Sequence, residues 1–332
     1  MTVTIALVGA GGIGTIHLGT LADIDAADVT AICDVSAEAA TAAAEEFGAD
    51  VYTDHEEMLS NEDLDALFVA IPPFAHTTQE TAGAEAGLDL FVEKPIALSG
   101  ETAARVDEAI AEAQVRSQVG HMYRYSPVVE EAVDRIGDRD VALIDGHWVG
   151  GVPPSGWWGV KEKSGGQVVE QAAHVFDLVR YFGGDVDSVC AQGGKSVVGD
   201  DIDFEDAVSA SMKHESGAVS HVSTSCASPD EHVALRLVGD GFHLELEFWF
   251  EGEEHPVSLG RLTGTVDGES IDLEAEEDAW AREVRSFVET VDGGEGDLRS
   301  PYDDARKTFE LTLAVNEALD EENAVELPLV SQ

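Results

Sequence analysis

Short apolar runs alternate with segments of helical composition over the N-terminal part of the chain. The first run, Val3–Val8, is rich in β-branched residues and indicates a buried strand, and a helix is expected directly after it. The further expected strands are Val29–Cys33, Asp65–Ile71, Leu88–Val92 and Gln118–Gly120. The further expected helices are Ser36–Phe47, His76–Ala86 and Gly100–Val115. Strands that alternate with helices form βαβ units, so the pattern predicts a parallel, doubly wound α/β sheet.

The pattern changes near His121. A helix is expected after Pro127, and from Val186 to about Leu259 short alternating runs follow one another without a helix between them, which is typical of an antiparallel sheet. The other expected elements are a strand at Val141–Val149 and helices at Gln167–Phe182, Ala279–Val291 and Tyr302–Leu319. The predicted architecture is an α/β Rossmann domain over residues 1–121, followed over residues 122–332 by an α+β domain with an open, mainly antiparallel sheet.

The turn after the first strand carries the most specific chemical signal. Gly9, Gly11 and Gly14 form a G-x-G-x-x-G pattern, in which glycines allow a tight turn, the approach of a pyrophosphate and close helix–strand packing. Asp34 follows the second strand, where a carboxylate accepts hydrogen bonds from the ribose hydroxyls of NAD and repels the 2′-phosphate of NADP. The sequence therefore predicts a site for NAD in preference to NADP. The expected cofactor-binding residues at the turn are Gly9, Gly11, Gly12, Ile13 and Gly14.

Acidic residues outnumber basic ones to an extreme degree. The chain has 67 Asp and Glu against 18 Lys and Arg, a formal net charge of −49. Because the acids are spread along the whole chain, they indicate the solvated surface of a protein from an extreme halophile. Phosphate backbones and acidic lipid headgroups repel such a polyanion, which disfavours nucleic acid and membrane surfaces as partners.

Cysteine usage and the start of the chain indicate the compartment. Cys33, Cys190 and Cys226 are widely separated, which suggests neither a disulfide framework nor a zinc site, and the histidines show no metal-ligand spacing. The chain enters a strand directly, with no basic leader segment, and no apolar run approaches the length of a membrane span. We therefore expect a cytoplasmic protein that binds no metal.

Hydride transfer needs a side chain that takes or gives the substrate proton. Lys94 follows the expected strand Leu88–Val92, at the edge where ligands of doubly wound sheets bind, and can act as a base or polarise a carbonyl. The alternative is an ordinary surface lysine. Glu170 and His174 are a second candidate, because four residues apart on one expected helix they share a face and can relay a proton. The alternative there is a solvated Glu–His pair.

Several short motifs occur together in an order that resembles the Gfo/Idh/MocA oxidoreductase family, which includes glucose-fructose oxidoreductase and inositol dehydrogenase. The resemblance covers nearly the whole chain. The motifs are the glycine fingerprint followed by His17, Pro72-Pro73 with His76, Glu93-Lys94-Pro95, Gly120–Pro127, and Ser164-Gly165-Gly166 leading to Glu170 and His174.

The resemblance implies an NAD(P)-binding domain and a second domain whose open sheet supports substrate binding and oligomer contacts, in a homodimer or homotetramer. Lys94 matches the lysine of the family's Glu-Lys-Pro motif and His174 its catalytic helix histidine, whereas Glu170 replaces the usual aspartate. Further expected cofactor contacts at the strand ends are Pro72, Pro73, His76, Glu93 and Lys94. Expected substrate contacts are Tyr123, Arg124, Gln171 and Trp158. The alternative for Arg124 is a buried arginine that ties the two domains together, and the alternative for Trp158 is core packing or an oligomer contact.

The predicted function is that of an NAD-dependent dehydrogenase. It would oxidise a secondary alcohol of a sugar, polyol or related hydroxy compound, or perform the reverse reduction, with Lys94 or His174 as proton acceptor. Glu170 would orient His174 or hold a substrate hydroxyl. Two alternatives remain: an NAD-dependent glycosidase-type enzyme that oxidises its substrate transiently, and a dinucleotide-sensing regulator without turnover.

Overall fold

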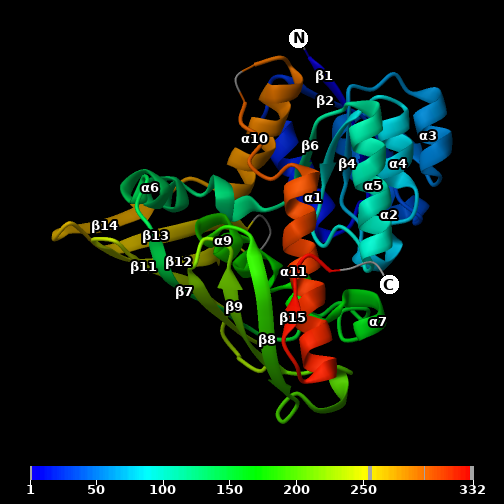
Figure 1. Cartoon of the computed structure of the whole chain (residues 1–332). Coiled ribbons are helices and arrows are strands. Elements are labelled where there is room, and N and C mark those ends of the chain that lie inside the picture. The colour runs from blue at the N-terminus through cyan, green and yellow to red at the C-terminus, as the bar shows by residue number, and fades with distance from the viewer. Residues whose placement is uncertain (1, 253–255, 295, 330–332) are drawn as a thin grey trace. The chain divides into compact units, whose positions relative to one another are not determined.

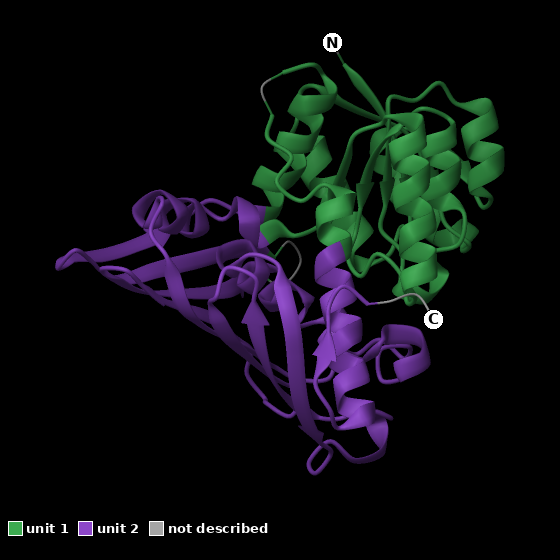
Figure 2. Cartoon of the chain, in the orientation of Figure 1, with its two compact units in different colours: residues 1–122, 252–256, 280–306 green, residues 123–251, 257–279, 307–332 purple. Residues whose placement is uncertain are grey.

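The computed structural model describes residues 2–252, 256–294 and 296–329, and the chain forms two compact units (Figure 2). Unit 1 comprises residues 1–122, 252–256 and 280–306, and unit 2 comprises residues 123–251, 257–279 and 307–332. Two segments from the C-terminal part of the chain therefore belong to the N-terminal unit.

Unit 1 contains the six-stranded sheet, in the order β3-β2-β1-β4-β5-β6 (Figure 1). All its neighbouring strands pair in parallel. The strands are β1 (Val3–Val8), β2 (Ala27–Cys33), β3 (Asp50–Tyr52), β4 (Ala66–Val69), β5 (Asp89–Val92) and β6 (Ser117–Val119). Successive strands are added first on one side of β1 and then, from β4 on, on its other side, which confirms the predicted doubly wound α/β sheet. This order places a ligand edge at the carboxyl ends of β1, β2, β4 and β5.

The helices of unit 1 connect these strands, except for one that comes from far along the chain. The connecting helices are α1 (Gly12–Ala22), α2 (Ala37–Phe47), α3 (His55–Asn61), α4 (Gln79–Glu85) and α5 (Gly100–Ala113). Most of α10 (Ala279–Val291) also belongs to unit 1, where the Phe287 ring packs edge-on against Phe68 and Phe91 at centroid distances of 5.4 and 5.5 Å. Burial of these aromatic rings explains why α10 joins the N-terminal core.

Unit 2 contains the nine-stranded sheet, in the order β14-β13-β12-β11-β7-β10-β9-β8-β15. The strands are β7 (Val141–Val149), β8 (Val186–Gly194), β9 (Ala207–His214), β10 (Val219–Ser225), β11 (His232–Gly239), β12 (Phe242–Glu251), β13 (Val257–Val266), β14 (Glu269–Ala275) and β15 (Val325–Glu326). Only β7 and β10 pair in parallel, and the other neighbouring pairs of these strands are antiparallel. The predicted, mainly antiparallel sheet is confirmed.

Helices pack on one face of this sheet. The helices of unit 2 are α6 (Pro127–Ile136), α7 (Lys161–Ser164), α8 (Gly166–Glu170), α9 (Ala173–Gly183) and the greater part of α11 (Tyr302–Glu321). α9 contacts β7, β10 and β11, and α6 contacts β12, β13 and β14. Alternate residues of β7, among them Ile144 and Trp148, are buried. This alternation gives the sheet one buried face and one more exposed face.

Two expectations about helices are wrong. The segment predicted as one helix, Gln167–Phe182, is divided into α8 and α9, because the N–H of Ala172 bonds back to the carbonyl of Gln167 and interrupts the regular ladder. Glu170 and His174 therefore do not share a face of one helix. The helix predicted for His76–Ala86 begins only at Gln79, and a short 3₁₀ turn, Pro73–Ala75, precedes His76. Apolar residues continue through the break between α8 and α9, so the hydrophobic pattern alone did not reveal it.

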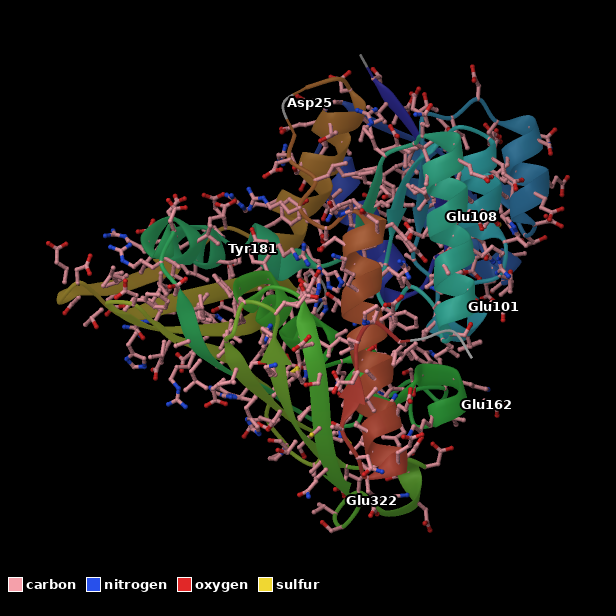
Figure 3. The ribbon with its side chains drawn as sticks, in the orientation of Figure 1. Asp25, Glu101, Glu108, Glu162, Tyr181 and Glu322 are labelled. Carbon is pink, nitrogen blue, oxygen red and sulfur yellow. The ribbon has the colours of Figure 1, made fainter. Side chains whose placement is uncertain are left out.

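Carboxylates are distributed over the surfaces of both units. Exposed examples are Glu101 and Glu108 on α5, and Glu162 and Glu322 in unit 2 (Figure 3). Within the described ranges, no helix combines the length and the apolar character that crossing a membrane requires.

Candidate active site

The glycine turn after β1 can be occupied only by glycine at two positions. Gly9 has φ +101°, and a Cβ atom there would lie 2.2 Å from the carbonyl oxygen of Ala70. A Cβ atom at Gly14 would lie 1.9 Å from the carbonyl oxygen of Gly9. Both positions bring the start of α1 close to the sheet, as the fingerprint predicts.

Gly11 and Gly12 border open space instead. No described heavy atom would lie within 4 Å of a Cβ atom at either glycine. Gly11 is the N-cap of α1 and has no side chain that could cap the first N–H groups of the helix. A helix N-terminus with accessible backbone at this point attracts an anion such as a pyrophosphate, so the turn fits the dinucleotide that the fingerprint predicts.

Asp34 is fixed beside this turn by two backbone hydrogen bonds. Its Oδ2 accepts from the N–H of Ala10 at 2.9 Å, and its Oδ1 accepts from the N–H of Ser36 at 2.8 Å. Each carboxylate oxygen has a second lone pair, so the group can still accept bonds from ribose hydroxyls. Asp34 stands at the carboxyl end of β2, as predicted.

Glu93 organises the segment after β5. Its buried carboxylate contacts His17 Nε2 at 2.7 Å through Oε1 and accepts the backbone N–H of Lys94 at 3.0 Å through Oε2. A Cβ atom at Gly120 would lie within 2.8 Å of the same carboxylate, so a side chain there would displace the carboxylate from this position. Glu93 thus holds the backbone from which the Lys94 side chain projects, and the Lys94–Pro95 peptide bond is cis.

The other predicted cofactor residues follow β4. Pro72 precedes the 3₁₀ turn and Pro73 opens it. His76 is buried, and its Nδ1 contacts Oε1 of Glu80, which lies in the first turn of α4 and is also buried. The glycine turn, Asp34, Pro72, Pro73, His76, Glu93 and Lys94 all belong to unit 1 and follow the carboxyl ends of its strands.

His174 lies in unit 2, in the first turn of α9, and is 5% exposed. Its imidazole stacks on the indole of Trp148 with 5.8 Å between ring centroids. It packs edge-on with the Tyr123 ring, with 5.4 Å between ring centroids. Tyr123 itself stacks on Phe248 at 4.2 Å. Two aromatic rings from the sheet side of unit 2 therefore restrict the orientation of the predicted catalytic imidazole.

Glu170 and Trp158 contact each other. The indole N–H of Trp158 donates to Oε2 of Glu170 at 2.5 Å. Trp158 is fully buried in a cluster with Ile202 and Phe204. This is the core packing that was expected as the alternative to a substrate contact. Glu170 is thereby positioned by a core tryptophan.

Arg124 makes a buried, bidentate ion pair within unit 2. Its Nε donates to Asp177 Oδ2 at 2.8 Å and its Nη2 to Oδ1 at 2.6 Å, and its guanidinium lies 4.9 Å from the centre of the Tyr181 ring. Thr308 Oγ1 donates to Asp177 Oδ1 at 2.9 Å. Arg124 is therefore buried, as the alternative to a substrate contact expects, but this ion pair lies within unit 2 and does not tie the two domains together.

Two residues around Tyr123 were missed in the sequence. Trp148 occupies a buried position in the alternation of β7, which would have placed it on the helix-covered face but not beside His174. Glu231 precedes β11 and has no motif around it. Burial, and to a lesser extent the charge of Glu231, raises the pKa of Tyr123 well above its ordinary value, so this phenol keeps its proton at neutral pH.

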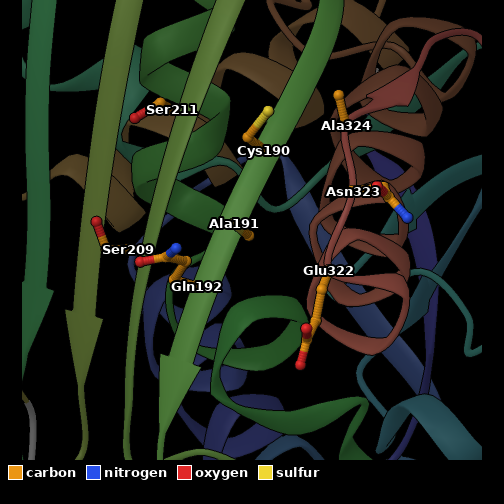
Figure 4. Close-up of a pocket in the computed structure, with 8 residues that line it drawn as sticks. All are labelled: Cys190, Ala191, Gln192, Ser209, Ser211, Glu322, Asn323 and Ala324. Carbon is orange, nitrogen blue, oxygen red and sulfur yellow. The ribbon is translucent and has the colours of Figure 1, made fainter.

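A pocket of about 390 Å³ elsewhere in unit 2 is separate from these groups (Figure 4). It is lined by β8, β9 and the segment after α11. The lining residues are Cys190, Ala191, Gln192, Ser209, Ser211, Glu322, Asn323 and Ala324. It contains no residue of α9 or of the glycine turn, so we assign it no part in the reaction.

Comparison with protein families supplies an independent finding. Residues 3–121 match the GFO/IDH/MocA oxidoreductase family model with an NAD-binding Rossmann fold, and residues 134–245 match the GFO/IDH/MocA C-terminal domain. The first match covers the six strands of the unit 1 sheet, and the second covers β7 to β11 and the start of β12 in unit 2.

Individual relatives span almost the whole chain. Myo-inositol 2-dehydrogenase of Thermotoga maritima is 28% identical over 97% of this chain and 98% of its own. D-xylose 1-dehydrogenase (NADP(+)) 2 of Haloferax volcanii is 25% identical over 87% of this chain and 89% of its own. The solved structure of levoglucosan dehydrogenase in complex with NADH and L-sorbose has the same fold, with a TM-score of 0.85 over 99% of this chain and 100% of its own at 18% identity.

These matches agree with the fingerprint, the strand order and the second sheet. The chain therefore belongs to the GFO/IDH/MocA family of NAD(P)-dependent oxidoreductases.

Proposed function

We propose that this protein is an NAD-dependent dehydrogenase that oxidises a secondary alcohol of a sugar, polyol or related hydroxy compound, or catalyses the reverse reduction. The observation that supports it best is the glycine turn, where open backbone at Gly11 and Gly12 adjoins the fixed carboxylate of Asp34. The names of the inositol and xylose dehydrogenases among its relatives support the substrate class.

The proposed reaction divides a secondary alcohol's two hydrogens between cofactor and protein. NAD, when bound, supplies the two-electron acceptor for the hydrogen of the carbinol carbon. Lys94 or His174 takes the hydroxyl proton as the C–O bond becomes a carbonyl. Glu93 holds the Lys94 backbone, and Trp148 and Tyr123 hold the His174 ring, so each candidate base has a restricted position.

The proposed reaction is tested by reduced-nicotinamide absorbance, with NAD and then NADP, against aldoses, polyols, inositols and sugar acids. Accumulation of NADH with one class of substrate supports a net dehydrogenase. A product without net NADH would favour the transient-redox alternative. NAD binding without any turnover, together with capture of a tight protein partner, would favour the sensing role.

Asp34 is proposed to make the site selective for NAD. Asp34→Ser removes the carboxylate that accepts from the ribose and repels a 2′-phosphate, so we expect NAD affinity to fall by about tenfold and discrimination against NADP to relax. Titration of both dinucleotides into the two proteins measures this. Unchanged affinity and selectivity in the serine variant would make the ribose assignment wrong. The comparison with NADP is needed because the Haloferax volcanii relative is named as NADP-dependent.

We propose that the protein works at high salt. Self-repulsion in a chain with a net charge of −49 destabilises the compact state, and salt screens it. Raising KCl from about 0.1 M to about 2 M is expected to raise the melting temperature by several degrees. Sucrose at matched viscosity is the control for non-ionic effects, and a melting temperature independent of KCl would contradict the proposal.

The remaining proposals concern the cell. We propose a cytoplasmic homodimer or homotetramer that binds neither nucleic acid nor membranes. Three free cysteines, of which Cys33 and Cys226 are buried, suit a reducing compartment. Light scattering in high KCl measures the assembly.

A further inference from the structure

Buried polar atoms are carried by the two aromatic rings that contact His174 and by Gln171, three residues before it in the chain. Within the described part of the chain, the Tyr123 hydroxyl, Trp148 Nε1 and Gln171 Oε1 are buried and have no hydrogen-bond partner. Tyr123 is 1% exposed and Trp148 is 5% exposed. Native proteins satisfy nearly all such groups, so polar atoms of this kind beside a candidate catalytic residue indicate a place where a polar ligand binds.

The fold brings Tyr123, Trp148 and His174 together on one side of the unit 2 sheet. Trp148 pairs with Val233 across β7 and β11, and Val233 pairs with Phe248 across β11 and β12. Tyr123 stacks on Phe248, and His174 stacks on Trp148. Glu231 directly precedes β11, two residues before Val233, and residues two apart in an extended chain share a face.

Gly150 leaves a notch beside two of these groups. A Cβ atom at Gly150 would lie 3.7 Å from Oε2 of Glu231 and 3.8 Å from Nε1 of Trp148. These are ordinary contact distances, so a small ligand group fits there next to an indole N–H donor and a carboxylate acceptor. Vicinal hydroxyls on one ring, which both donate and accept, can satisfy the two.

The carboxylate of Glu231 also affects which ligand charge the notch accepts. Although the residue as a whole is exposed, partial burial of its carboxyl group raises the pKa of Glu231 above its ordinary value. A carboxylate that has lost hydration gains from a hydroxyl donor and disfavours a second carboxylate close by. The notch therefore suits neutral polyhydroxy compounds better than sugar acids.

We propose that Tyr123, Trp148, Gln171 and Glu231 form a hydroxyl-binding subsite beside His174, with the Gly150 notch at its centre, and that Glu231 selects neutral sugars or polyols over sugar acids. The proposal rests on the proposed dehydrogenase function and specifies its substrate class. Glu231 and Trp148 act in it as specificity-determining residues.

The test uses two variants with matched controls. Glu231→Gln removes the charge, and Gly150→Ala fills the notch at contact distances that the fold tolerates. The controls are Glu245→Gln, at an exposed position of β12, and Gly156→Ala, where no described heavy atom lies within 4 Å of the added Cβ atom. Ligand-observed NMR on the NAD-loaded protein measures binding of myo-inositol, D-xylose and D-glucuronate, and steady-state kinetics measure KM and kcat for each probe that turns over.

We expect both variants to weaken binding of the neutral probes, and to raise their KM, by about tenfold. The controls should change neither quantity, and NAD affinity should be unchanged in all four proteins. Glu231→Gln should also reduce the ratio of the affinity for the neutral probes to the affinity for D-glucuronate. If the wild type binds D-glucuronate as well as the neutral probes, binds none of the probes, or keeps its probe affinity in both variants, the subsite is wrong. If the protein turns over a probe but the two variants bind it as well as the wild type, the subsite is wrong and the dehydrogenase function is supported. If the variants weaken binding but no probe turns over, the subsite is supported and the dehydrogenase function is contradicted.

Discussion

Replacement of Lys94 by alanine is expected to lower kcat by roughly 10²- to 10⁴-fold, the range that loss of a general acid–base group produces. NAD affinity should change little, because the glycine turn and Asp34 remain intact. Steady-state rates with the best substrate and a fluorescence titration of NAD separate the two effects. Lys213→Ala, which removes one partner of an exposed ion pair with Asp187, is the matched control and should keep full activity.

The same experiment with His174→Gln decides which group takes the proton. Loss of the proton acceptor should abolish the limb of the pH–rate profile on which activity rises with pH, whereas loss of the other group should lower the plateau and keep that limb. A Lys94→Ala variant that retains most of its activity, together with a His174→Gln variant that does the same, would remove both residues from the proposed chemistry.

Replacement of Asp177 by asparagine is expected to destabilise unit 2 by about 3–5 kcal/mol, because it leaves the guanidinium of Arg124 buried without its counter-charge. The two side chains are 1% and 3% exposed, and the pair is bidentate. Thr308 would also lose its charged acceptor. Thermal and denaturant unfolding in high KCl measure the effect.

Asp187→Asn provides the comparison for this second prediction. Asp187 pairs with Lys213 at 2.9 Å, but both side chains are largely in solvent, so its loss should cost less than about 1 kcal/mol. Equal melting temperatures for the two asparagine variants would show that burial does not strengthen the Arg124–Asp177 pair. A milder loss in Arg124→Met with Asp177→Leu than in Asp177→Asn alone would support the argument, since the double variant leaves no unpaired charge.

Local patterns were sufficient for much of unit 1. The β1 run, the glycines and Asp34 lie within one βαβ unit, where strand, turn and helix are determined by neighbours in sequence. The requirement for glycine at Gly9 and Gly14 could be predicted because the fingerprint encodes a particular backbone approach, which the contacts with Ala70 and Gly9 reproduce. The alternation in β9 and β12 likewise predicted the second sheet.

The sequence by itself determined the alternation of strands and helices in unit 1, the cofactor turn and the acidic surface, because each depends on residues close in the chain or on composition. It did not reveal the short elements β3 and α3. Only the tertiary structure decided that Phe287 packs in unit 1 and that Glu93 contacts His17. It alone also showed that the segment predicted as one helix breaks between α8 and α9. It also decided that Trp148 and Tyr123 surround His174. These contacts join residues far apart in the chain or depend on a local break in backbone bonding, and hydrophobic periodicity records which residues are buried but not which partners they meet.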